Sequence, residues 1–198
     1  EADWPRLLDA MAGDVRIIVS NTADQGFVLS PQDDAGLIGH PQRVPISYPA
    51  KLLVLLHHRW RQQPDAPLSI YPCELVERNG DVLRDIVGTL ARDWQLPAAF
   101  QAWARTHCVW ANSLVDRIVS EALHPIGAVA EPYALWAIER QPRLQLPCRH
   151  PAIVLTEDLA AHERLKLFLL NAGHSLLVES WHRGGAPEGM TVGQAMRN

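Results

Sequence analysis

Short β-branched runs alternate with longer periodic segments along most of this 198-residue chain, and this alternation constrains its fold more than any other feature. Residues 15–21 (Val-Arg-Ile-Ile-Val-Ser-Asn) are short and β-branched, which predicts a buried strand. Two more strands are expected at 68–74 and 108–110. Apolar residues recur at helical spacing around them and predict helices at 50–62, 81–94 and 98–106. Strands separated by helices predict an α/β fold, with a more helical C-terminal part.

The charge and cysteine content narrow the classes of partner. The chain has 18 Lys and Arg against 22 Asp and Glu, a net charge of −4, whereas nucleic acids and anionic membranes require a basic surface. No apolar run reaches the roughly 18–20 residues of a membrane helix. Three cysteines suit free thiols in a reducing compartment better than a disulfide scaffold. We therefore expect a cytoplasmic protein without nucleic-acid or membrane partners, and the sequence leaves its oligomeric state open.

The segment 160–179 is the strongest predicted helix, and four polar residues share one arc of it. At about 100° per residue, Glu163 lies at roughly +60°, His174 at roughly +80° and Asn171 at roughly +140° from Lys166. Most of the remaining surface is apolar, which predicts that the helix is buried. Buried polar groups need partners or a function.

These four side chains suit acid–base chemistry at an alcohol or a carbonyl. Burial lowers the pKa of a lysine, so Lys166 is a candidate general base. Asn171 can donate its amide hydrogens to a developing oxyanion, and His174 can orient a hydroxyl. A purely structural interpretation stays open, in which Lys166 extends to solvent and Asn171 and His174 are satisfied polar residues of the core.

Six short motifs, in order along the chain, resemble the long-chain mannitol dehydrogenase family. They are Ser20-Asn21-Thr22, Ser47–Leu52, Pro72–Leu75 with Asn79-Gly80-Asp81, Asn112–Ile118, Glu131–Tyr133 with Trp136–Glu139, and Lys166-x4-Asn171-x2-His174. Members of that family are NAD-dependent polyol and sugar-acid dehydrogenases that work without zinc. The resemblance is nearest to the hexuronate branch, whose substrates are tagaturonate or altronate.

The resemblance implies roles for individual residues. Lys166 would be the general base, Glu163 would lie on its proton path, His174 would orient the substrate, and Asn171 with Asn112 would polarise the reacting oxygen. Cofactor-binding residues would be Ser20, Asn21, Thr22, Cys73 and Glu74. Substrate-binding residues would be Lys51, Asp116 and Arg117. The implied cofactor is NAD, with NADP left open, the implied ligand is a small sugar acid or polyol, and no metal is implied.

The resemblance also predicts how the chain is divided. No Gly-x-Gly-x-x-Gly turn follows a predicted strand, and the chain resembles the middle of a family member. Residues 1–130 would be the later part of a Rossmann-like dinucleotide-binding domain, and residues 131–198 the start of a mostly α-helical substrate domain. The alternative is a truncated or degenerate member without catalytic activity, serving as a binding or interaction module.

A metal-dependent hydrolase using His57, His58 or His174 is a third, weaker interpretation. Adjacent residues of a helix point about 100° apart, so the imidazoles of His57 and His58 are not expected to bind one metal ion. We expect the pair to lie on an exposed helix face.

Overall fold

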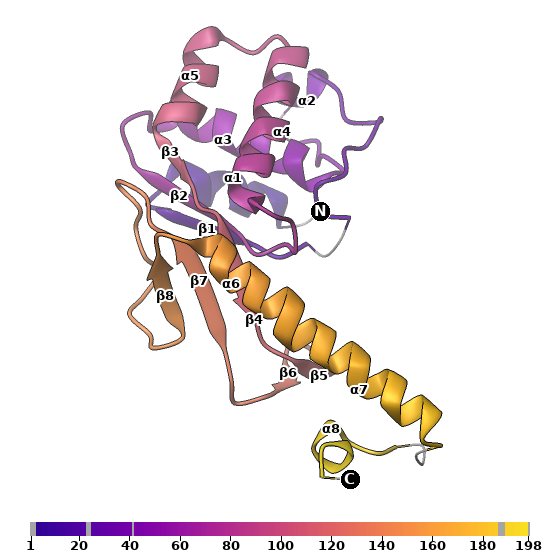
Figure 1. Ribbon diagram of the computed structural model, residues 1–198. Helices are drawn as coiled ribbons and strands as arrows, with labels where there is room; N and C mark the ends of the chain where they lie inside the picture. The colour runs from indigo at the N-terminus through magenta and orange to yellow at the C-terminus, as the bar shows by residue number, and fades with distance from the viewer. Residues whose placement is uncertain (1–2, 23–24, 41, 186–188, 198) are drawn as a thin grey trace. The chain divides into compact units, whose positions relative to one another are not determined.

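Three parallel strands form a sheet in the first part of the molecule (Figure 1). They are β1 (Ile17–Ser20), β2 (Leu68–Pro72) and β3 (Cys108–Trp110), in the order β1-β2-β3. Ile18 is in register with Ile70, and Ile70 with Trp110. The computed structural model describes residues 3–22, 25–40, 42–185 and 189–197. The chain has two compact units, Glu1–Glu157 and Asp158–Asn198.

Helices cover one face of this sheet (Figure 1). The elements are α1 (Trp4–Ala12), α2 (Gly36–Gly39), α3 (Tyr48–Gln62), α4 (Asn79–Asp93) and α5 (Ala98–Thr106). Leu53 of α3, Leu83 of α4 and Phe100 of α5 pack with Leu68 and Ile70 of β2 in one buried cluster. Pro49 lies in the first turn of α3, where its missing N–H costs no hydrogen bond. The predicted α/β fold is confirmed for this unit.

A second sheet packs on the opposite face. It contains β4 (Ser113–Asp116), β7 (Leu135–Glu139) and β8 (Ile153–Thr156) in the order β4-β7-β8, with β4 antiparallel and β8 parallel to β7. Tyr71, Ala111 and Ile138 form the small buried cluster between the sheets. A separate hairpin, β5 (Val119–Ala122) with β6 (Ala128–Ala130), was not predicted. The domain boundary at 130/131 stays a prediction, although β4 before it pairs with β7 after it.

The unit Asp158–Asn198 contains a long helical segment made of three successive elements. These are α6 (Leu159–Leu165), the π-helical turn η1 (Lys166–Asn171) and α7 (Ala172–Arg183); the short α8 (Val192–Ala195) follows. Asp158 caps α6 by accepting a hydrogen bond from the Ala161 backbone N–H at 3.0 Å. The predicted helix is confirmed, but the expectation that it is buried is wrong, because Leu165, Phe168 and Leu176 are exposed.

The expectation for the histidine pair is also corrected. His57 is buried, and its ring lies 5.2 Å from the Phe100 ring in an edge-on arrangement. This burial lowers the pKa of His57, and the positive charge of Arg61 lowers it further. His57 lies on the same helix as buried apolar residues such as Leu53 and Leu56, and packing of that helix against the core buries its ring as well. Among the described residues no group of three or more His, Cys, Asp or Glu side chains is placed to hold a metal ion.

None of the helices in the described ranges is both long and apolar enough to cross a membrane.

Candidate functional site at the strand ends

Glu74 holds the loop that follows β1. Its carboxylate accepts hydrogen bonds from the Ser20 hydroxyl at 3.1 Å and from the Thr22 hydroxyl and backbone N–H at 2.7 and 3.0 Å. Glu74 is only 3% exposed, and a buried carboxylate is stabilised by several donors of this kind. The carboxyl ends of β1 and β2 are adjacent in the parallel sheet, so residues 52 positions apart meet here. The structure therefore brings together three of the predicted cofactor-binding residues.

The other two predicted cofactor-binding residues lie at the same strand ends. Asn21 is exposed between Ser20 and Thr22. Cys73 is buried, and its backbone N–H donates to the Ser20 carbonyl at 2.8 Å. Burial raises the pKa of the Cys73 thiol to about 11. Cys73 is thus a protonated, packed thiol at neutral pH, in contrast to the exposed amide of Asn21.

Asn79, at the start of α4, joins the end of β2 to the start of β4. Its amide nitrogen donates to the carbonyls of Pro72, Glu74 and Ser113 at 2.8 to 3.0 Å. Its amide oxygen accepts from the backbone N–H groups of Gly80 and Ser113. The side chain is buried, so these bonds satisfy an amide that water cannot reach. Asn79 therefore fixes the position of α4 against the strand ends.

Gly80 makes this close arrangement possible. A Cβ atom on Gly80 would lie 2.5 Å from the Ala111 carbonyl oxygen and 2.6 Å from its carbon. Real Cβ atoms do not approach backbone this closely, so no other residue fits here without a shift of β3 or α4.

Asn112 lies next to this contact, and its amide is fully used within the protein. Its oxygen accepts from the Asp81 backbone N–H at 3.0 Å. Its nitrogen donates to the carboxylates of Asp81 at 3.1 Å and Glu139 at 2.7 Å. An amide nitrogen has two N–H groups, so both have carboxylate partners in this structure. Asn112 therefore connects α4 to β7 through hydrogen bonds to Asp81 and Glu139.

Asp81 collects several donors besides Asn112. Arg78 donates to it at 2.8 Å, and Arg84 donates to its other oxygen, also at 2.8 Å. Although partial burial raises the pKa of the Asp81 carboxyl, these hydrogen bonds and positive charges outweigh burial and lower it overall. Asp81 is therefore ionised at neutral pH, and sequence reasoning noted it only as part of the motif Asn79-Gly80-Asp81.

The predicted substrate-binding residues lie on different elements. Lys51 is half-buried on α3. Asp116 is buried at the end of β4. Arg117 is exposed and donates to the Glu131 carbonyl at 3.0 Å. Lys51 and the Asp116–Arg117 pair thus come from separate parts of the α/β unit, and their joint role in substrate binding stays a prediction.

The long helix of the second unit carries the four predicted acid–base residues. Lys166 and Asn171 are the first and last residues of the π turn, Glu163 precedes it in α6, and His174 follows it in α7. Glu163, Lys166 and His174 are half-buried, whereas Asn171 is exposed. All four therefore retain access to a ligand.

The π turn changes their angular arrangement. Its backbone bonds join residues i and i+5, so the turn takes up one residue more than an α turn. Residues beyond it then sit about 100° back from their place on a uniform α-helix. Asn171 moves from roughly +140° to about +40° from Lys166, and His174 from roughly +80° to about −20°. With Glu163 at about +60°, the four side chains share a much narrower face than the sequence predicted.

Comparisons with known proteins agree with the motifs. Residues 9–147 match the family described as the mannitol dehydrogenase Rossmann domain. The chain is 31% identical over 216 residues to an altronate oxidoreductase of Halalkalibacterium halodurans and 32% identical over 209 residues to one of Cronobacter sakazakii. These alignments cover 98% and 93% of this chain but 40% and 41% of the relatives, so the chain spans about two fifths of their length.

Solved structures show the same fold. A D-sorbitol dehydrogenase in substrate-free form and the Pseudomonas fluorescens mannitol 2-dehydrogenase, solved as a ternary complex with NAD and D-mannitol, each superpose with a TM-score of 0.70 at 20% identity. They match 89% and 92% of this chain and 41% of their own chains. The predicted Rossmann-like α/β fold is thereby confirmed, and the chain belongs to the mannitol dehydrogenase family.

Proposed function

We propose that this chain takes part in an NAD-dependent oxidoreductase that interconverts a secondary alcohol of a sugar acid or polyol and its ketone. Family membership supports the reaction class. The altronate oxidoreductase relatives favour a hexuronate substrate of the tagaturonate or altronate type. The observation that supports catalysis by this chain most directly is the narrow polar face that the π turn creates from Glu163, Lys166, Asn171 and His174.

The strand ends fit a bound dinucleotide. In open parallel sheets, ligands bind outside the carboxyl ends of the strands, where Ser20, Asn21 and Thr22 lie. Glu74 fixes this loop through three hydrogen bonds, which leaves the Asn21 side chain free to face a ligand. Bound NAD would supply the hydride acceptor for oxidation of the alcohol, and NADH the hydride donor for reduction of the ketone. NADP remains an alternative cofactor.

Lys166 is proposed as the general base that removes the hydroxyl proton of the alcohol. In this mechanism no metal ion takes part. Glu163 lies one helical turn before it, on the same face, and would pass that proton to solvent. Asn171 would donate to the reacting oxygen, and His174 would orient the neighbouring hydroxyl. Asn112 can share in this step only if it gives up a carboxylate partner, so we assign it a positioning role.

The test is NADH oxidation by the 198-residue chain with tagaturonate, fructuronate and fructose. We expect the fastest turnover with tagaturonate. Lys166→Ala should lower kcat by about 10²- to 10⁴-fold, with NADH affinity unchanged. Glu179→Ala is the matched control, because Glu179 is exposed on the same helix and pairs with Arg183.

Two results would contradict the proposal. Folded chain that turns over none of the three ketones would support the non-catalytic alternative. Undiminished turnover by Lys166→Ala would remove Lys166 from the mechanism while leaving the reaction class standing.

A further inference from the structure

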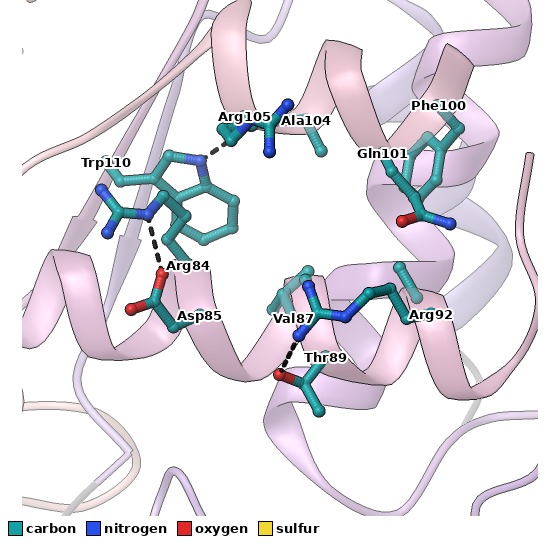
Figure 2. A pocket seen from close by; sticks show the side chains of 12 residues that line it. Arg84, Asp85, Val87, Thr89, Arg92, Phe100, Gln101, Ala104, Arg105 and Trp110 are labelled. Carbon is teal, nitrogen blue, oxygen red and sulfur yellow. Dashed lines mark hydrogen bonds and ion pairs between the residues drawn. The ribbon is translucent and has the colours of Figure 1, made fainter. Parts of the chain in front are cut away.

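A cavity lies between α4 and α5 (Figure 2). Its volume is about 350 Å³, which suits a small ligand. Arginines, polar side chains and aromatic residues line it. Among them are Arg84, Arg92, Gln101, Arg105, Phe100 and Trp110. It includes none of the residues predicted to bind cofactor or substrate.

The charge in this cavity is unbalanced. Arg84 is neutralised, because it donates to Asp81 at 2.8 Å and to Asp85 at 3.0 Å. Within the described ranges, the Arg92 guanidinium donates only to the uncharged Thr89 hydroxyl, at 2.9 Å. Arg105 makes neither a hydrogen bond nor an ion pair with any residue that the structure describes. Two guanidinium groups on facing helices thus border the cavity without a carboxylate partner (Figure 2).

The floor of the cavity is apolar. Val87 (1% exposed) and Phe100 (0% exposed) are buried beneath the cavity, and Trp110, at 4% exposed, is the ring that keeps some surface there. The Trp110 indole N–H is already used, because it donates to the Ala104 carbonyl at 2.9 Å. The floor therefore offers apolar carbon and part of the Trp110 ring, while Arg92 and Arg105, which lack a carboxylate partner among the described residues, stand at the rim.

We propose that this cavity binds a small aromatic anion, a planar ring that carries one phosphate or carboxylate group. Guanidinium groups bind phosphate and carboxylate through paired N–H donors, and Arg92 and Arg105 are both free to do so. The ring of the ligand would pack against Trp110, where apolar contact and ring stacking contribute to affinity. The site is separate from the proposed dinucleotide site and does not depend on it.

The test is calorimetric titration of the 198-residue chain with phenyl phosphate, inorganic phosphate and phenol. Phenyl phosphate should bind at least about tenfold more tightly than either of the others, because only it has both the ring and the charge. Arg92→Gln and Arg105→Gln should each weaken phenyl phosphate binding by about tenfold or more. Arg61→Gln, which alters an exposed arginine of α3 outside the cavity, should leave binding unchanged.

Three outcomes would overturn the proposal. They are no binding of phenyl phosphate by the folded chain, equal binding by the wild type and both cavity variants, and loss of binding in Glu74→Ala but not in Arg105→Gln. The last result would place phenyl phosphate at the strand ends instead. Circular dichroism of each variant checks folding, which exposed residues such as Arg92 and Arg105 should not disturb.

Discussion

The two compact units differ in how far their apolar helix side chains are buried. In Glu1–Glu157, leucines such as Leu53 are fully buried between α3 and the first sheet. In Asp158–Asn198, Leu169 is 68% exposed on a helix with a comparable share of apolar residues. Helical periodicity predicted a helix in both places and was right in both. Burial differs because it needs a second surface, and the α/β unit supplies one in its sheet.

The largest contrast is expected from truncating one leucine in each unit. Leu53→Ala should lower the free energy of unfolding by about 3 kcal/mol, because it leaves a cavity in a packed core. Leu169→Ala should change it by less than about 0.5 kcal/mol. Urea unfolding followed by circular dichroism measures both, and equal losses would show that Leu169 is buried in solution.

A pair of glycines in α4 tests whether the strand ends are as tightly packed as the core. Gly80→Ala should destabilise the chain by about 2 kcal/mol, because its Cβ would overlap the Ala111 backbone. Gly88→Ala, in the middle of the same helix, has its nearest neighbour at 3.9 Å and should stabilise by about 0.5–1 kcal/mol. Changes of the same sign in the two variants would contradict the close contact.

The carboxylate at the strand ends should matter more than a neighbouring one on the surface. Glu74→Ala should cost about 2 kcal/mol, since it leaves the Ser20 and Thr22 donors without their acceptor. Glu77→Ala, an exposed residue of the same loop, serves as the control and should be neutral. NADH affinity should fall only in Glu74→Ala, and an unchanged affinity would argue that the loop is not part of the dinucleotide site.

The smallest expected effect is on the alkylation of the cysteine thiols. It compares buried with exposed cysteines within the α/β unit. Burial raises the pKa of Cys73 to about 11 and that of Cys108 to about 12, so both stay protonated at pH 8, whereas Cys148 is exposed. Iodoacetamide should therefore modify Cys148 alone, with no loss of stability. Peptide mass spectrometry locates the label, and alkylation of Cys73 in folded protein would contradict its burial.

The sequence predicted the elements whose side chains alternate between a core and its surroundings. Each of the three strands β1, β2 and β3 was expected within a few residues, and so were α3, α4 and α5. The hairpin β5–β6 was missed because all four residues of β5 are exposed, so no apolar alternation marks them. The short α8 was missed too, although the capping box of Thr191 and Gln194 was a signal for it.

The candidate site was predicted in outline but not in its connections. The resemblance grouped Ser20, Thr22 and Glu74 as cofactor-binding residues, and the structure brings them together because parallel strands share a carboxyl edge. Two hydrogen bonds join residues far apart in the sequence. Asn79 bonds Ser113, 34 positions away, and Asn112 bonds Glu139, 27 positions away. No local sequence pattern encodes such contacts. The π turn was not predicted for another reason. A helical wheel assumes the same rotation for every residue, so it cannot represent a local change of helix type.

That turn also has a consequence for how such helices are recognised. On an α-helix, side chains that meet are three or four residues apart. Lys166 and Asn171 are five apart, yet the π turn aligns them as an α-helix aligns a pair separated by four. A search for helical pairs at the usual separations passes over them. Removing one leucine between them would shorten the spacing to four, restore uninterrupted α-helical bonding and keep both side chains on the same face.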